Sequence, residues 1–197
     1  ISSVLSEDGV WVFEQSYLPA MLRTNSYDTI CQEHVEYYSL AAIQHILDQA
    51  GMTITDASQN EVNGGSVRLA AVHKNSALAD KVSPEAAWLI QQEKTHDIFS
   101  NQPWVDFQRN VDRQKSDLIN LLTELKNSGK TVIGYGASTK GNVILQYCDI
   151  GPDLLPFIGD ITPSKDGVFT PGSKIPVISM EKAKAMKPDY FLVLPWG

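Results

Sequence analysis

A glycine-rich turn in the second half constrains the fold of this 197-residue chain more than any other feature. The apolar run at residues 131–133 leads into Gly134-Tyr-Gly-Ala-Ser-Thr-Lys-Gly141, and a helical pattern follows the turn. Another apolar run, residues 155–159, ends on Asp160. Strand, glycine-rich turn, helix and strand in this order form a βαβ unit, in which the strands are parallel. The second half of the chain is therefore predicted to be an α/β unit.

The same turn is a candidate anion site. Its backbone N–H groups and the helix N-terminus favour a phosphate, and Asp160 lies where a dinucleotide-binding fold keeps its ribose-binding acid. Neither known motif is complete, because a G-x-G-x-x-G loop would need glycine in place of Thr139 and a phosphate loop would need lysine in place of Asn142. A tight turn without a ligand is an equally good interpretation.

The first half predicts a strand, a helix and a hairpin. Residues 10–13 follow an Asp-Gly turn and are predicted to form a short buried strand with Glu14 at its tip. The pattern over residues 39–50 predicts a helix capped by serine at its start and ended by the glycine that follows. Residues 52–57 and 66–72 are strand-like and flank an Asn-Gly-Gly turn, which indicates an antiparallel hairpin.

Two helices are predicted to join these halves. Ser83 and Pro84 open the first, and the pattern breaks only near Asn101-Gln-Pro103 before it continues to residue 127. The second helix carries apolar residues at mostly helical spacing, and we expect them to pack: Phe107, Val111, Leu118, Leu121, Leu122 and Leu125.

Charge and cysteine content exclude several classes of protein. With 16 basic and 23 acidic residues the net charge is −7, which argues against a nucleic-acid partner or an anionic membrane surface. The two cysteines, Cys31 and Cys148, have no paired spacing, so we expect neither a disulfide framework nor a metal site. No apolar run approaches the roughly 20 residues of a membrane span. A cytoplasmic protein is expected, and self-association into a homo-oligomer stays open.

One segment could transfer protons. Asp28-Thr-Ile-Cys-Gln-Glu-His34 places Glu33 beside His34, shortly before Tyr37 and the predicted helix. Histidine titrates near neutral pH, and an adjacent carboxylate could hold its ring in the tautomer that a general base needs. The alternative is an ordinary surface Glu-His pair.

Together these motifs resemble the S-adenosylmethionine-dependent C-methyltransferases of deoxysugar biosynthesis, which act on nucleotide-linked keto sugars. The resemblance covers nearly the whole chain. The matching pieces are Val10-Trp-Val-Phe-Glu14 with Tyr17-Leu18, Asp28-Thr-Ile-Cys-Gln-Glu-His34 leading to Tyr37-Tyr38-Ser39, Asn63-Gly-Gly-Ser-Val-Arg68, Gly134-Tyr-Gly-Ala-Ser-Thr-Lys-Gly-Asn142, Asp160 with Pro163, Lys165, Gly167, Pro171-Gly172 and Ile175-Pro176, and Leu194-Pro195-Trp196.

The resemblance implies an α/β fold in three parts. Residues 1–75 would be the C-terminal part of a methyltransferase domain, with the last strands of its class I sheet. Residues 76–128 would be a helical connector, and residues 129–197 a Rossmann-like parallel-sheet domain. We expect the chain to be the C-terminal portion of such an enzyme, without the family's zinc-binding domain or its S-adenosylmethionine loop. On its own it should therefore bind little cofactor and be inactive.

The resemblance also assigns roles to residues. His34 would be the base that removes a proton next to the sugar ketone, with Glu33 as its neighbour. Cys31 and Gln32 depart from the family, which commonly has tyrosine and histidine there. The competing functions are a nucleotide- or dinucleotide-binding module without catalysis and a scaffold that associates through its connector helices. The expected substrate-binding residues are Glu14, Tyr37, Arg68, Gly136, Lys140, Asn142 and Asp160.

Overall fold

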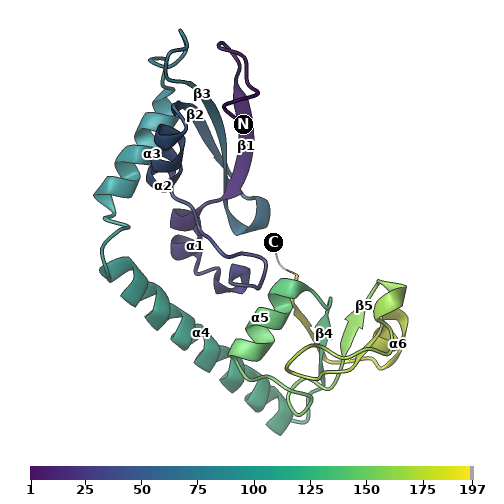
Figure 1. Ribbon diagram of the computed structural model, residues 1–197. Helices are drawn as coiled ribbons and strands as arrows, with labels where there is room; N and C mark the ends of the chain where they lie inside the picture. Colours follow the sequence, from purple (N-terminus) through teal and green to yellow (C-terminus); the bar gives the residue numbers. More distant parts are fainter. Residues whose placement is uncertain (196–197) are drawn as a thin grey trace. The chain divides into compact units, whose positions relative to one another are not determined.

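The computed structural model describes residues 1–195, apart from the side chain of Asn63. The chain forms two compact units (Figure 1). The first unit contains residues 1–26 and 36–107, and the second contains residues 27–35 together with the described residues from 108 onward. Each unit combines helices with a sheet, so the predicted α/β class is confirmed. The division at residues 75 and 128 stays a prediction, and Trp196 lies outside the described residues.

The first unit is built on an antiparallel sheet of three strands. These are β1 (Trp11–Ser16), β2 (Met52–Asn60) and β3 (Ser66–His73), in the spatial order β1-β3-β2. The pairing of β2 with β3 confirms the predicted hairpin. A short 3-10 turn, η2 (Val62–Gly64), connects the two strands.

Strand β1 differs from the prediction. It runs on to Ser16, so Glu14 lies inside the strand and pairs with Arg68 of β3 instead of standing at a strand tip. Its outer face is also exposed, since Val12 keeps 59% of its accessible surface. The reason is that successive side chains of a strand point to opposite faces of the sheet, so Trp11 and Phe13 pack against the core while Val12 and Glu14 lie on the other face.

Three helices complete the first unit: α1 (Leu18–Thr24), α2 (Leu40–Gln49) and α3 (Pro84–Thr95). Ser39 caps α2, because its hydroxyl accepts a hydrogen bond from the Ala42 amide at 3.1 Å. The predicted helix is thus confirmed. Both α2 and α3 contact β2, and the core between them contains Leu40, Ile43, Leu47, Ile54, Ala57, Leu69 and Leu89.

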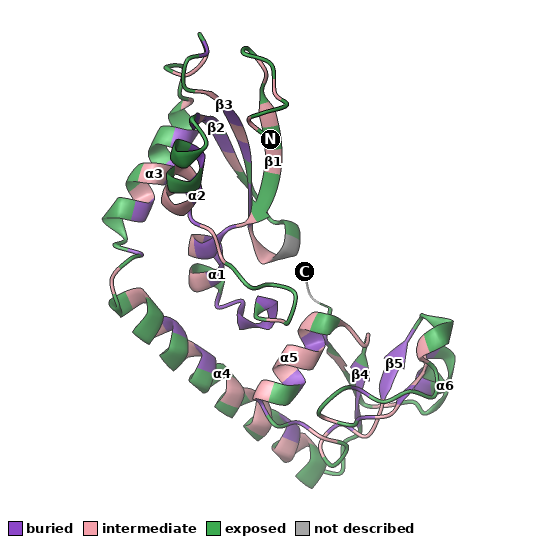
Figure 2. Ribbon diagram, in the orientation of Figure 1, coloured by how far each residue is buried: buried purple, intermediate pink, exposed green. Residues whose placement is uncertain are grey.

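The second unit contains a parallel sheet of four strands in the order β6-β5-β4-β7. The strands are β4 (Val132–Tyr135), β5 (Ile158–Asp160), β6 (Val177–Ser179) and β7 (Tyr190–Val193). All three neighbouring pairs are parallel, as the βαβ pattern predicts. Every residue of β5 is buried (Figure 2), which is expected of a central parallel strand.

Helices pack on both faces of this parallel sheet. Leu122 of α4 (Gln102–Asn127) and Leu145 of α5 (Thr139–Tyr147) share one core with Val132. On the other face, Ala183 of α6 (Met180–Ala185) packs with Ile133. Two 3-10 turns, η1 (Tyr27–Thr29) and η3 (Pro163–Lys165), complete the unit.

The packing prediction for α4 is confirmed except at one residue. Phe107, Val111 and Leu122 are buried, whereas Leu121 is 52% exposed. Leu118, Ile119, Leu122 and Leu125 form the apolar stripe of α4 that packs against the core of the second unit, and Leu121 is not part of this stripe.

Candidate functional site

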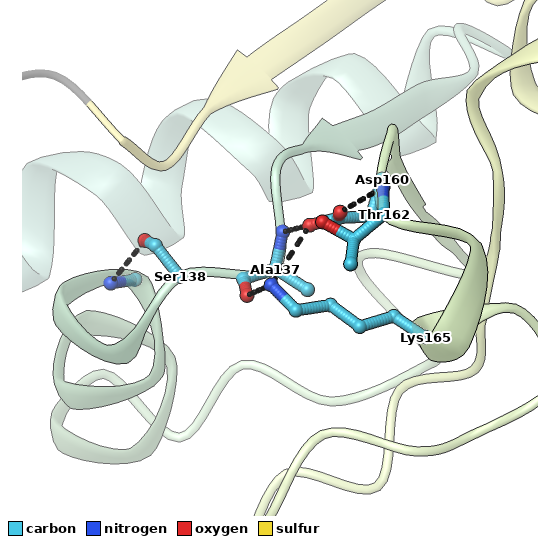
Figure 3. Close-up of polar contacts among 6 residues, drawn as sticks. Ala137, Ser138, Asp160, Thr162 and Lys165 are labelled. Atoms are coloured by element: carbon cyan, nitrogen blue, oxygen red, sulfur yellow. Dashed lines mark hydrogen bonds and ion pairs between the residues drawn. The ribbon is translucent and has the colours of Figure 1, made fainter.

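The glycine-rich turn has the geometry that the sequence predicts. It leaves the carboxyl end of β4 and enters α5, and Ser138 caps the helix by accepting a hydrogen bond from the Gly141 amide at 3.0 Å (Figure 3). Ligands of open α/β sheets gather at this edge, where parallel strands end. The turn therefore lies where an α/β fold places a binding site.

Asp160, the last residue of β5, fastens this turn to the next loop. Its Oδ2 atom accepts a hydrogen bond from the Ala137 amide at 2.7 Å, and its Oδ1 atom accepts one from the Thr162 amide at 2.8 Å (Figure 3). The ammonium of Lys165 lies 3.3 Å from Oδ2 and donates to the Ala137 carbonyl at 2.8 Å. These contacts hold both loops at the carboxyl edge of the sheet.

The same contacts control the charge of Asp160. Burial on its own would raise the pKa of this carboxyl, but hydrogen bonds from Thr162, Ala137 and Lys165 outweigh burial and lower the pKa to about 2. The carboxylate is therefore ionised at neutral pH. Both of its oxygens already accept protein donors, which gives Asp160 a structural role; its contact with a ribose stays a prediction.

The glycines of the turn are accounted for by packing. Gly136 has a φ of +82°, and a Cβ atom there would lie 2.7 Å from the ring of Pro195. At Gly141 a Cβ atom would lie 2.7 Å from the Cβ atom of Leu194. Both positions therefore need glycine for the chain to pass close to the end of β7. Glycine at these two positions is thus no evidence for a phosphate.

The side chain of Asn142 has an acceptor without a partner. It lies in the first turn of α5, and its Oδ1 atom is buried without a hydrogen-bond partner among the described residues. A buried acceptor left without a donor costs about 1–3 kcal/mol. An N–H or O–H donor, from a bound water molecule or from a ligand, would remove this cost. Lys140 precedes Asn142 in the same turn and is half-buried.

The predicted base lies on a short segment of the second unit. Residues 27–29 are buried in η1, whereas Glu33 and His34 are exposed. The His34 amide donates to the Cys31 carbonyl at 3.0 Å, which closes a turn. Tyr37, predicted to bind substrate, is assigned to the first unit.

Cys31 is half-buried. Burial, followed by the nearby charge of Glu33, raises the pKa of its thiol. The thiol therefore stays protonated at neutral pH, and a role as a nucleophilic thiolate is disfavoured.

Glu14 and Arg68 come together on the sheet of the first unit. They are exposed and lie directly opposite each other in the register of β1 and β3, and Arg68 also donates to the Ser58 hydroxyl at 3.2 Å. Glu33 and His34 belong to the second unit. The roles of Glu14 and Arg68 in substrate binding stay predictions.

Sequence reasoning missed Lys165 as a residue of the glycine-rich turn. Its spacing of five residues from Asp160 was available in the sequence, but the 3-10 turn that brings its ammonium back to Ala137 was not foreseen. In residues 1–195, no group of three or more histidine, cysteine, aspartate or glutamate side chains could hold a metal ion. None of the helices described is long and apolar enough to cross a membrane.

A parallel sheet with a glycine-rich turn at its carboxyl edge makes the second unit Rossmann-like. The chain belongs to the C-methyltransferase family, because the model of the C-methyltransferase C-terminal domain matches residues 61–197. Over 198 residues the chain is 34% identical to C-methyltransferase NovU of Streptomyces niveus. That match covers 100% of this chain and 46% of NovU, so the chain spans about half the length of this relative. The family predicted from the sequence is confirmed.

Proposed function

We propose that the full-length protein is an S-adenosylmethionine-dependent C-methyltransferase acting on a nucleotide-linked keto-deoxysugar. The observation that carries this proposal is the similarity to C-methyltransferase NovU along the whole chain, together with the match to the C-methyltransferase C-terminal domain. In this reading the chain supplies the base and part of the substrate site.

The proposed reaction begins with proton abstraction. His34 takes a proton from the sugar carbon next to the ketone, and the electrons of the broken C–H bond move to the ketone oxygen as an enolate. The enolate carbon would then take the methyl group of S-adenosylmethionine as the methyl–sulfur bond breaks and its electrons stay on sulfur. The proton stays on the imidazole until solvent removes it. The exposed position of His34 leaves its ring accessible for this exchange. Glu33 supports the ring through its charge.

We expect S-adenosylmethionine to supply the methyl group. We assign no contact with this cofactor to the described residues, because Gly136 and Gly141 of the glycine-rich turn are accounted for by packing against Pro195 and Leu194. The part of the reaction assigned to this chain is therefore limited to proton transfer and substrate binding.

The nucleotide would bind at the first turn of α5. The helix N-terminus and Lys140 favour a diphosphate, and the unpartnered Oδ1 atom of Asn142 would accept a hydrogen bond from the ligand. The same atom favours the second candidate function, a nucleotide- or dinucleotide-binding module without catalysis. Arg68 and Glu14 remain candidate substrate-binding residues.

Methyl transfer can be tested directly. The full-length protein is incubated with S-adenosylmethionine labelled with ¹³C in its methyl group and with a TDP-linked keto-deoxysugar. We expect a labelled methyl group on the carbon next to the ketone, detected by NMR. The matched control is the same sugar with its ketone reduced to an alcohol, which should give no product because its C–H bond is no longer acidic.

A thermal-shift panel separates the two candidates. A ligand at 100 times its Kd stabilises the protein by about 2.7 kcal/mol, so S-adenosylmethionine, NAD and the TDP-sugar can be compared at equal concentration. Stabilisation by the TDP-sugar together with labelled product supports the methyltransferase. Stabilisation by NAD without methyl transfer to any keto sugar would support the binding module instead.

A further inference from the structure

The segment that carries His34 is held by a different unit from its neighbours in the chain. Residues 27–35 belong to the second unit, although the residues on either side belong to the first. Within the second unit, η1 packs against α5. The position of the predicted base therefore depends on how this short segment is attached to α5.

Tyr27 makes the attachment. Its side chain is buried, and its hydroxyl lies 3.6 Å from the Sγ atom of Cys148, the residue that ends α5. Its ring also packs against that of Tyr147, with the ring centroids 5.3 Å apart at an angle of 55°. A polar contact and a ring contact thus fix the same side chain, and such aromatic pairs contribute about 0.5–1.5 kcal/mol beyond burial.

Helix α4 holds Tyr147 in turn. The Tyr147 hydroxyl donates to Asp112 at 2.7 Å and accepts from Gln108 at 3.0 Å. The ammonium of Lys115 lies 5.0 Å from the centroid of the ring, within the range of a cation–π interaction. Three side chains of one helix therefore orient the ring on which Tyr27 rests.

Burial changes abruptly along the segment. Asp28 and Thr29 are buried together with Tyr27, whereas Ile30 is 49% exposed and Glu33 and His34 are exposed. The turn between Cys31 and His34 is closed by a backbone hydrogen bond. The buried part of the segment is thus the anchor from which the exposed turn projects.

We propose that Tyr27, held by Cys148 and Tyr147, is a positioning residue. It fixes the turn between Cys31 and His34 and thereby the place of the His34 ring. This inference rests on the proposed function, in which His34 is the base. The physical reason is that proton abstraction needs the imidazole close to the carbon, and a misplacement of about 1 Å can slow a reaction about 100-fold.

The test uses four single variants of the full-length protein and the double variant Tyr27→Phe/Cys148→Ala. Tyr27→Phe removes the hydroxyl and keeps the ring, so we expect it to fold. Cys148→Ser keeps a hydrogen-bonding group opposite Tyr27 and serves as the conservative rescue, while Cys148→Ala removes it. Tyr190→Phe is the matched control, because it removes a hydroxyl from an exposed tyrosine of the same unit.

Two readouts are needed. Amide hydrogen exchange over residues 27–35 reports whether the segment stays docked, and it needs no substrate. The second is the deuterium that a TDP-linked keto-deoxysugar takes up from D₂O at the carbon next to its ketone, without S-adenosylmethionine, measured as kcat and KM across pH. If Tyr27 had only a structural role, its substitution would change the melting temperature but would not lower kcat at constant KM.

For Tyr27→Phe and Cys148→Ala we expect faster amide exchange in residues 27–35 and a kcat about 10- to 100-fold lower. The KM and the shape of the pH profile should change little. The double variant should be no slower than either single variant, since both remove one contact. Cys148→Ser and Tyr190→Phe should behave like the wild type.

Other results would overturn the inference. Faster amide exchange with an unchanged kcat would mean that docking does not position the base, and unchanged amide exchange would mean that Tyr27 does not anchor the segment. Failure of the proposed function is distinguishable, because the wild type would then catalyse no deuterium uptake while Tyr27→Phe still altered amide exchange.

Discussion

The carboxylate of Glu93 accepts a hydrogen bond from the hydroxyl of Tyr17 at 2.9 Å, which joins α3 to the residue that follows β1. It also accepts the backbone amides of Leu40 at 2.6 Å and Ala41 at 3.0 Å, at the start of α2. Glu93 is 2% exposed. A buried negative charge is tolerated here because three donors and the positive end of a helix surround it. Burial, then the charge of Glu93, raises the pKa of Tyr17.

Glu93→Ala should lower the free energy of unfolding of the first unit by about 3 kcal/mol, because it leaves buried donors of three residues without an acceptor. Urea denaturation followed by circular dichroism measures this change. Tyr17→Phe should lower it by only about 1 kcal/mol, since one hydrogen bond is lost.

Lys94→Ala is the control, because Lys94 is exposed on the same helix. Its effect should stay within about 0.5 kcal/mol. If Glu93→Ala were as mild as this control, the carboxylate would not be the link between α2, α3 and Tyr17.

Asp160 should make the second unit sensitive to acid. Its folded pKa is lowered to about 2 from the ordinary value of 3.8, so the stability it contributes is present above about pH 4 and is lost as the pH falls to about 2. The contribution at neutral pH is about 2 kcal/mol, at roughly 1.4 kcal/mol per pKa unit. Asp160→Asn should therefore be less stable than the wild type at pH 7 and differ little from it at pH 2. Chemical denaturation at both values checks this, and an equal difference at the two pH values would contradict it.

Gly136 and Gly129 form a matched pair for separating backbone strain from packing. Both have positive φ, at +82° and +72°, but a Cβ atom meets Pro195 only at Gly136, and nothing lies within 4 Å at Gly129. Gly129→Ala should cost about 1 kcal/mol from strain alone. Gly136→Ala should cost about 1–3 kcal/mol more, because the contact must also be relieved. Equal losses in urea denaturation would show that Pro195 moves aside freely.

The sequence predicted those elements whose signals are local. The cap at Ser39, the hairpin around the Asn-Gly-Gly turn and the βαβ unit around Gly136 are all confirmed, since each depends on residues close together in the chain.

Features that depend on distant residues were not predicted. The length of β1 follows from its pairing with β3, which lies about 55 positions away, so Glu14 was misplaced at a strand tip. The same holds for the contact between Tyr27 and Cys148, 121 positions apart, which assigns residues 27–35 to the second unit. Nothing in the local pattern of either residue indicates its partner.

The central claim is that His34 removes a proton from the carbon next to a ketone, and deuterium uptake at that carbon tests it without the methyl donor. In D₂O the full-length wild type should exchange this hydrogen of a TDP-linked keto-deoxysugar. His34→Asn should be slower by about 10² to 10⁴ with an unchanged melting curve, and Glu33→Gln should lose less, because Glu33 does not carry the proton. Exchange at a near wild-type rate in a folded His34→Asn protein would assign the base to another residue and contradict the account.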